Sequence, residues 1–210
     1  MVHPPTNLKN HFFTIDLLKS IAVQIIILHH LSNYGEISYA ARELWPAVFE
    51  WLGNYGRYAV EIFLVMGGYL AVKNISTQVS TKGLITPVFN RYLRLVPTYF
   101  TALLFTIVCA TIARYFNYQL YMGQPETIWQ VLSHLILLQQ ILGFESISLG
   151  VWYVAIDWQL YFFFATIFFF LKSYKKSILC LSIFMLSAFC YFSQQSDYEN
   201  YFIYFIGIYG

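Results

Sequence analysis

Long apolar stretches alternate with short polar segments along the chain, and their lengths predict membrane-spanning helices. A helix needs about 17–25 mostly apolar residues to cross a bilayer. Such stretches run over residues 12–31, 58–72, 86–113, 150–171 and 177–192, and a last one starts near 201 and is still running at 210. The pattern predicts an all-α, polytopic transmembrane helical bundle with about five to seven spans.

Two prolines refine the third stretch. Thr86 followed by Pro87 is typical of a helix start, because the first turn does not need the N–H that proline lacks. At Pro97, further along the same stretch, we expect a kink that neighbouring helices compensate.

Residues 128–142 are apolar but short, about fifteen residues, and segments of this length are more often re-entrant or interfacial. Cytoplasmic loops are enriched in Lys and Arg. If the N-terminus is cytoplasmic and 128–142 does not cross, then the basic segments 73–94 and 172–176 both lie inside. Full crossing would place 172–176 outside. We therefore predict an interfacial segment at 128–142 and a short cytoplasmic N-terminus at residues 1–10.

The composition agrees with a lipid environment. Hydrophobic residues make up 59% of the 210 residues and charged residues only 10%, whereas globular domains average about 25% charged. The 20% aromatic content suits interfacial belts, and a net charge of +2 is too small to indicate nucleic-acid binding. The three cysteines lie in apolar runs without metal-ligand spacing, and we expect them to be packed small side chains.

Ionisable residues on the first stretch are the most informative polar feature. A charge at the bilayer centre costs at least about 2.5–3.5 kcal/mol, which makes such residues functional candidates. At about 100° per residue, Lys19 and His30 differ by about 20° around a helix, and Asp16 lies about 40° from His30 on the other side. The three share one stripe, on which Asp16 and Lys19 are close enough to pair and His30 lies deep, beside a polar cavity.

The alternative is that Lys19 extends to the interface while His30 only hydrogen-bonds a neighbouring helix. His29 lies about 80° off the stripe, so we expect it to be structural or interfacial.

Arg91 and Arg94 stand three positions apart and share a helix face. Two guanidinium groups there could hold phosphates through paired hydrogen bonds. The alternative is that they only anchor the helix at the cytoplasmic boundary. Another arginine, Arg57, stands four positions before Glu61, and we expect these two to pair.

Residues 152–161 place Tyr153, Asp157 and Tyr161 at four-residue spacing on one face of a helix. A buried carboxylate without a partner would protonate. We therefore expect Asp157 to be paired with Lys19, with an arginine or with a substrate hydroxyl. Such a pair could be structural or catalytic.

Four short motifs, in this order, resemble the acyltransferase 3 family of bacterial membrane proteins, which includes O-acetylases of lipopolysaccharide O-antigen and other surface glycans. The family's opening helix carries an arginine and a histidine separated by ten residues. Lys19 and His30 have that spacing, with Lys in place of Arg. Residues 60–70 are similar to the family's acidic-Φ-Phe-Phe-x-x-Ser-Gly-Phe-Leu segment, with Gly67 in place of its serine.

The other two motifs lie further along the chain. Arg91 to Pro97 match the family's Arg-x-x-Arg-x-x-Pro element intact. Residues 152–161 resemble Trp-x-Leu-x-x-Glu-x-Gln-Phe-Tyr, with Asp157 where the family has Glu. Members usually have more spans than the six or so in this sequence, so residues 11–210 are expected to form an acyltransferase 3-like transmembrane domain that is incomplete at its C-terminus.

The resemblance implies transfer of an acyl group, often acetyl, from a cytoplasmic acyl-CoA such as acetyl-CoA, without a metal. The acceptor would be a hydroxyl of a membrane-bound or exported saccharide. His30 would take the hydroxyl proton as a general base or carry the acyl group transiently, and the spacing leaves both open. Lys19 and Asp16 would set the polarity of the site, and Asp157 would orient the imidazole or the acceptor.

The resemblance also implies binding roles. Arg91 and Arg94 would hold the phosphates of acyl-CoA, while Trp152, Tyr161 and Glu61 would contact the acceptor. The expected partners are the lipid bilayer, a saccharide or lipid-linked glycan and other glycan-assembly proteins, and the expected location is the bacterial inner membrane. Two alternatives are a non-catalytic transporter or scaffold for a glycan intermediate and a truncated, inactive remnant.

Overall fold

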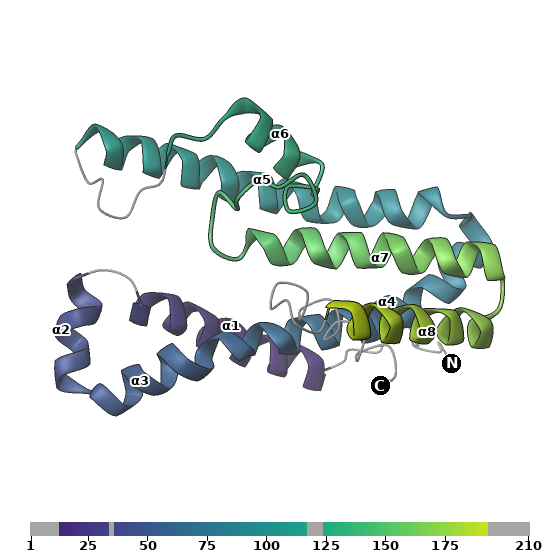
Figure 1. Ribbon diagram of the computed structural model, residues 1–210, viewed down its shortest axis with the longest axis horizontal. Helices are drawn as coiled ribbons and strands as arrows, with labels where there is room; N and C mark the ends of the chain where they lie inside the picture. The colour runs from purple at the N-terminus through teal and green to yellow at the C-terminus, as the bar shows by residue number, and fades with distance from the viewer. Residues whose placement is uncertain (1–12, 34–35, 117–123, 193–210) are drawn as a thin grey trace, which may run out of the picture. The chain divides into compact units, whose positions relative to one another are not determined.

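The computed structural model describes residues 13–33, 36–116 and 124–192, and in these ranges it is helical, without strands (Figure 1). The helices are α1 (Phe13–Asn33), α2 (Glu36–Leu44), α3 (Pro46–Tyr55), a 3-10 turn η1 (Gly56–Tyr58), α4 (Ala59–Lys82), α5 (Ile85–Tyr115), α6 (Ile128–Leu135), α7 (Val151–Leu171) and α8 (Tyr174–Phe192). The all-α prediction is confirmed.

Three of the described helices, α1, α5 and α7, are long and apolar enough to cross a membrane. They correspond to three of the five complete stretches expected from the sequence, and α7 begins one residue after the predicted start at 150. The other two stretches form α4 and α8. The segments expected at 1–10 and 201–210 lie outside the described residues. A membrane helical bundle is therefore confirmed.

The start of α5 differs from the sequence prediction. Leu84 is the N-cap, without a side-chain hydrogen bond, so Thr86 and Pro87 already lie inside the first turn. Only Gly83 and Leu84 separate α4 from α5. Gly83 has a φ of 73°, a left-handed conformation that glycine adopts without steric cost, and this permits the short connection. Further on, α5 continues through Pro97 to Tyr115.

The segment 128–142 does not form a spanning helix. Its helical part, α6, has eight residues, which is about 12 Å at 1.5 Å per residue, against the ~30 Å of a hydrocarbon core. The Oγ1 of Thr127 caps it by accepting a hydrogen bond from the Gln130 N–H. The prediction that this segment does not cross is thus supported by its length.

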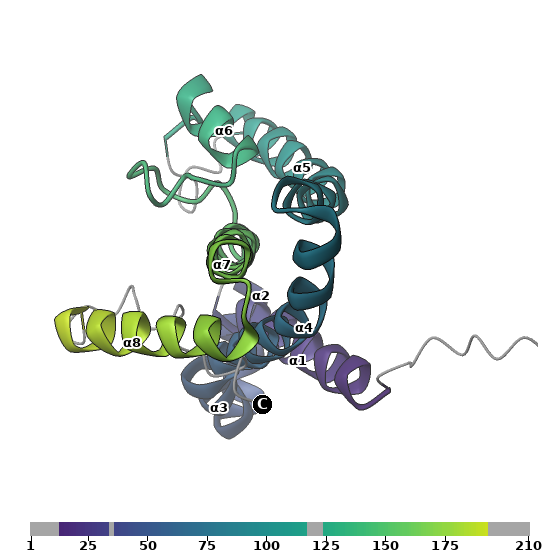
Figure 2. The ribbon, with the colours of Figure 1, turned by 90° about the vertical axis from the view of Figure 1, so that its right-hand side faces the viewer.

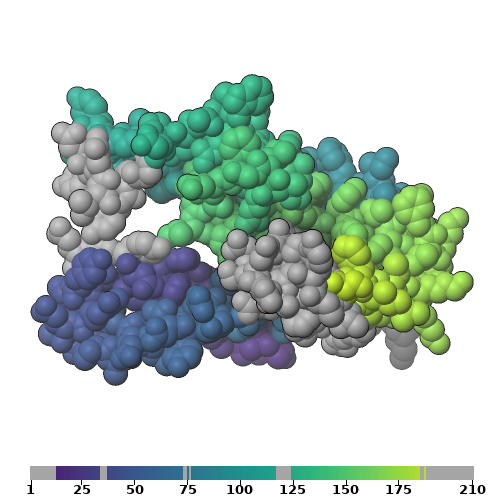
Figure 3. Space-filling view, in the orientation of Figure 1, coloured from purple at the N-terminus to yellow at the C-terminus, as the bar shows by residue number. Residues whose placement is uncertain are grey.

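The chain divides into two compact units, one ending at Gly67 and one beginning at Gly68. In the first unit, α1 packs against α2, α3 and η1. In the second, α7 lies between α5 and α8 (Figure 2), and the surfaces of α7 and α8 adjoin (Figure 3). The ring centroids of Phe163 on α7 and Phe184 on α8 lie 4.9 Å apart. The core of the second unit includes Tyr99, Leu103, Leu137, Val151 and Ala155.

The outward face of α5 is apolar. Phe105, Val108 and Ile112 are 70%, 54% and 53% exposed, which suits contact with lipid chains. Cys109 on this helix and Cys180 on α8 are free and exposed. The expectation that they are packed in the core is wrong, because an apolar side chain on a membrane helix can face lipid as readily as protein. Cys190 lies where no side chain is described.

Candidate active site

The first unit carries the predicted polar stripe on α1. Asp16 lies in the first turn of α1 and His30 in the last. Because α1 is a regular helix from Phe13 to Asn33, the stripe exists as the spacing predicted. Lys19 and His30 are eleven residues, about 16 Å, apart along the axis. His30 therefore lies in the last turn of α1, while Asp16 and Lys19 lie toward its opposite end. That His30 lies deep, beside a polar cavity, stays a prediction.

His30 has one ring nitrogen that is buried without a partner. Its Nδ1 makes no hydrogen bond to any residue of the described ranges, and the ring is half-buried. The centroids of the His29 and His30 rings lie 5.3 Å apart. A buried ring nitrogen that the described residues leave without a partner is a candidate acceptor for a proton.

His29 has the structural role that its position off the stripe predicts. Its Nδ1 lies 2.8 Å from the carbonyl oxygen of Leu52 on α3. A carbonyl only accepts, so Nδ1 donates and carries the proton. Asn33 donates to the His29 carbonyl at 2.9 Å. Gly56 is close as well, because a Cβ there would lie 2.7 Å from the His29 Cβ. His29 thus fixes the end of α1 against α3 and η1.

The second unit joins two predicted site residues directly. The Nη2 of Arg91 on α5 donates to both carboxylate oxygens of Asp157 on α7, at 2.7 Å each. Their side chains are 14% and 7% exposed. Of the three partners expected for Asp157, the structure shows an arginine. In a buried setting the charge of each residue is stabilised mainly by the other.

Tyr161 completes this cluster. The guanidinium carbon of Arg91 lies 4.4 Å from the centre of the Tyr161 ring, a cation–π arrangement that contributes about 0.5–2 kcal/mol. Tyr161, Asp157 and Tyr153 follow each other at four-residue spacing on α7, as predicted. The first two are buried and Tyr153 is partly buried.

Arg94 has a different environment from Arg91, although the sequence placed both on one helix face. Arg94 is exposed and makes no ion pair with a described residue. It lines a cavity of about 550 Å³ together with Thr98 and Tyr99 of α5 and residues 148–151 at the start of α7. Arg91 is thus neutralised by a carboxylate, while Arg94 faces a space that a ligand could enter.

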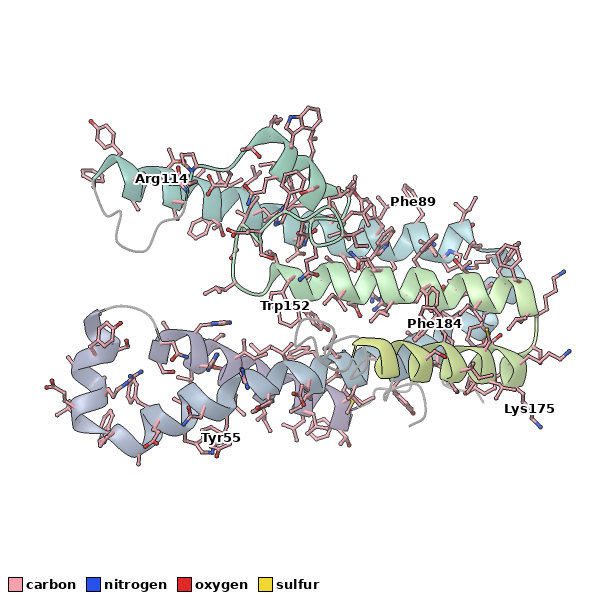
Figure 4. All side chains as sticks on the ribbon, in the orientation of Figure 1. Tyr55, Phe89, Arg114, Trp152, Lys175 and Phe184 are labelled. Atoms are coloured by element: carbon pink, nitrogen blue, oxygen red, sulfur yellow. The ribbon has the colours of Figure 1, made fainter. Side chains whose placement is uncertain are left out.

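Two further candidates lie at the starts of helices. Trp152 is in the first turn of α7, partly buried, and is labelled in Figure 4. Glu61 is in the first turn of α4 and is partly buried as well. Arg57, which the spacing paired with Glu61, donates to the hydroxyl of Tyr58 at 2.9 Å. The acceptor-binding roles of Trp152 and Glu61 stay predictions.

Sequence reasoning did not find the polar contacts that hold residues 136–150. His134 is fully buried, and its Nδ1 donates to the Gln130 carbonyl at 2.8 Å, because its Nε2 already accepts from the Ile147 N–H at 3.1 Å. Burial lowers the pKa of His134 below its usual value. The only signal in the sequence is a cluster of polar residues inside a short apolar segment.

Two side chains from the long helices hold the same segment. The Tyr92 hydroxyl of α5 donates to the Leu135 carbonyl at 2.8 Å. Gln159 of α7 donates to the carbonyl of Leu137, whose φ is 58°, at 2.6 Å. The segment after α6 is therefore fixed against both helices that carry the Arg91–Asp157 pair.

These contacts describe a membrane protein whose buried charges lie on helices long enough to span the bilayer. The model of the acyltransferase 3 family, described as an acyltransferase domain, matches residues 12–210. The chain belongs to this family, as its four motifs indicated, and its class is that of the membrane acyltransferases. Comparison with curated proteins and with solved structures finds no match.

Proposed function

We propose that this protein transfers an acyl group, in the first place acetyl, from acyl-CoA to a hydroxyl of a surface saccharide or lipid-linked glycan. The observation that carries the proposal is the state of His30. It is half-buried, its Nδ1 makes no hydrogen bond to a described residue, and it keeps the Lys19-to-His30 spacing of the family's opening helix. Family membership supports the reaction class.

In the proposed reaction His30 is a general base. It accepts the proton of the acceptor hydroxyl while the hydroxyl oxygen bonds to the carbonyl carbon of the thioester. The carbon–sulfur bond then breaks, the acyl group stays on the acceptor oxygen, and the thiolate leaves with the proton that His30 returns. His29 holds the end of α1 in place through Leu52 and thereby positions the neighbouring imidazole.

For the donor we propose that Arg94 holds a phosphate of acyl-CoA. Arg94 faces a cavity, and a guanidinium binds phosphate through paired hydrogen bonds. Arg91 was expected to share this role, but its charge is balanced by Asp157. We therefore assign Arg91 and Asp157 to the joining of α5 to α7 within the second unit. The proposed location is the bacterial inner membrane with a cytoplasmic N-terminus.

The test compares the acetyl content of surface glycans, by mass spectrometry, between cells with the wild-type gene and cells with His30→Ala at equal membrane abundance. We expect the acetyl group to be lost in His30→Ala and retained in Ser20→Ala, whose exposed hydroxyl donates to the Asp16 carbonyl on the same helix. Normal acetylation in His30→Ala would contradict the proposal.

A second measurement addresses the donor. We expect Arg94→Ala to raise the KM for acetyl-CoA more than it lowers kcat, because a phosphate contact far from the reacting carbon acts in binding. The outcome that favours a transporter or scaffold is the absence of any acetyl-CoA binding in the wild type, together with unchanged function of the protein in Arg94→Ala.

A further inference from the structure

A second cavity lies at the other end of α7, where the sequence pointed to no site. Its volume is about 470 Å³. Residues near the end of α4, the last turn of α7 and the α7–α8 connection line it: Val79, Ser80, Gly83, Phe168, Phe169, Lys172, Ser173 and Tyr174. All belong to the second unit of the chain.

The lining has two kinds of surface. Val79, Phe168 and Phe169 make one part apolar, while Lys172 and the hydroxyl side chains of Ser80 and Ser173 make the other part polar. A cation and hydroxyl donors beside aromatic and aliphatic groups suit a ligand that is anionic at one end and apolar at the other.

The position of the cavity indicates where such a ligand comes from. Lys172 directly follows Leu171, the last residue of a helix long and apolar enough to span the membrane. Lys175, labelled in Figure 4, and Lys176 follow in the first turn of α8. The polar part of the cavity therefore lies at the boundary between the hydrocarbon core and the headgroup layer, where basic pockets between helices bind anionic headgroups.

The backbone conformation of Lys172 decides which substitution can test the site. Its φ is 48° and its ψ is 21°, the left-handed conformation that ends a helix and is usually taken by glycine. A residue with a Cβ adopts this conformation less readily than glycine or asparagine. The conformation ends α7, where the Lys172 N–H donates to the Phe168 carbonyl, and the Lys172 side chain lines the cavity.

We propose that this cavity binds the phosphate headgroup of an anionic phospholipid. Lys172 supplies the charge, Ser80 and Ser173 donate hydrogen bonds, and the phenylalanines contact the first carbons of the acyl chains. On the predicted orientation the lipid belongs to the cytoplasmic leaflet. The site does not depend on the acyl transfer proposed above, because none of its lining residues belongs to the candidate active site.

The experiment uses the full chain in neutral phosphatidylcholine nanodiscs and measures the thermal unfolding midpoint as phosphatidylglycerol is added. Inorganic phosphate is titrated in parallel, to separate a lipid headgroup from a soluble anion. We expect phosphatidylglycerol to raise the midpoint and phosphate to have no effect. Native mass spectrometry should then show phosphatidylglycerol retained on the protein.

Two variants test the site itself. Lys172→Asn removes the charge but tolerates the left-handed backbone, so it folds, and we expect about five-fold weaker binding of phosphatidylglycerol. Ser80→Phe fills the cavity and should abolish binding. The matched control is Lys176→Gln, which removes an equal charge from the first turn of α8 without lining the cavity.

Three results would overturn the proposal. Equal losses of phosphatidylglycerol binding in Lys176→Gln and Lys172→Asn would mean that the lipid is only attracted diffusely to a positively charged surface. A rise of the unfolding midpoint with inorganic phosphate, but not with phosphatidylglycerol, would mean that the cavity binds a soluble anion. Unchanged binding in Ser80→Phe would place the lipid elsewhere on the protein.

Discussion

The Nη2 nitrogen of Arg91 lies 2.7 Å from each carboxylate oxygen of Asp157, which joins α5 to α7 across 66 positions of the sequence. Both side chains are largely buried, and the guanidinium also lies over the Tyr161 ring. The arginine that opens the Arg-x-x-Arg element is therefore part of the internal framework. Arg94 remains as the arginine that faces a cavity.

This pair predicts a strong coupling between the two residues. Removing either partner deprives the other of its oppositely charged group in a buried setting, so Arg91→Ala and Asp157→Ala should each destabilise the protein by about 3–5 kcal/mol. The loss in free energy of unfolding in the double variant should be clearly smaller than the sum of the two single losses, because both charges are then absent. Thermal unfolding of the purified variants measures this.

The matched control is Arg94→Ala, one turn further along α5, which should change stability by no more than about 0.5 kcal/mol. Additive effects of Arg91→Ala and Asp157→Ala would show that the two residues act independently.

The contact between Gly56 and His29 predicts a difference between two neighbouring glycines. A Cβ at position 56 would lie 2.7 Å from the His29 Cβ, so Gly56→Ala should cost about 1–3 kcal/mol and should lower acetyl transfer, since His29 positions His30. A Cβ at Gly53 would lie 3.5 Å from the Asn33 Oδ1, which is ordinary contact.

Gly53→Ala should therefore be neutral or stabilise by about 0.5–1 kcal/mol, because alanine is the better helix residue. Thermal unfolding and acetyl transfer are measured on both variants. Equal tolerance at the two positions would show that the close approach at Gly56 does not matter.

The burial of His134 predicts a pH dependence of the segment 136–150. The folded pKa is lowered, so the unfolded segment binds the proton more readily. Neutral His134 contributes its full stabilisation of the folded segment above a pH of about 6.5, the ordinary pKa of histidine. This contribution is lost as the pH falls from there toward the lower pKa of the folded state. Amide exchange at Ile147, corrected for its intrinsic rate, should be faster at about pH 5.5 than at about pH 7.5.

In His134→Gln this difference should disappear, because an amide can still accept from Ile147 and donate to Gln130 but does not titrate in this range. An unchanged pH dependence in His134→Gln would assign the effect to another group.

The ion pair between Arg114 and Glu126 predicts a second pH dependence of stability, at lower pH than that of His134. Arg114 at the end of α5 makes two hydrogen bonds to the Glu126 carboxylate, at 3.0 and 2.9 Å, and these bonds lower the pKa of Glu126. The stability from this pair is present above the usual glutamate value of about 4.3 and is lost as the pH falls from there toward the folded pKa. Glu126→Gln should therefore cost about 1 kcal/mol in thermal unfolding at about pH 6.5, and its difference from the wild type should shrink as the pH falls below about 4.3.

The helices themselves could be predicted because their cause is local. A span requires a certain length of apolar residues, so α7 begins within one residue of the predicted start and α6 is as short as expected. The start of α5 was misplaced because the left-handed Gly83 permits a shorter connection than the Thr86–Pro87 pair suggested.

The site could be predicted only in part. Helical periodicity placed Asp16, Lys19 and His30 on one stripe, and four-residue spacing placed Tyr153 and Asp157 on one face. The same periodicity could not show that Arg91 is buried in an ion pair while Arg94 faces a cavity. The surroundings of each side chain depend on what packs against the helix.

The sequence by itself determined the membrane environment, the helical class and the motifs of the acyltransferase 3 family, since each of these depends on residues close together in the chain. Only the tertiary structure decided that Asp157 takes Arg91 as its partner and that His29 bonds Leu52. It also decided that His134 bridges α6 to Ile147. These contacts depend on how helices pack, and a buried polar group takes whichever partner the packing brings within hydrogen-bond distance.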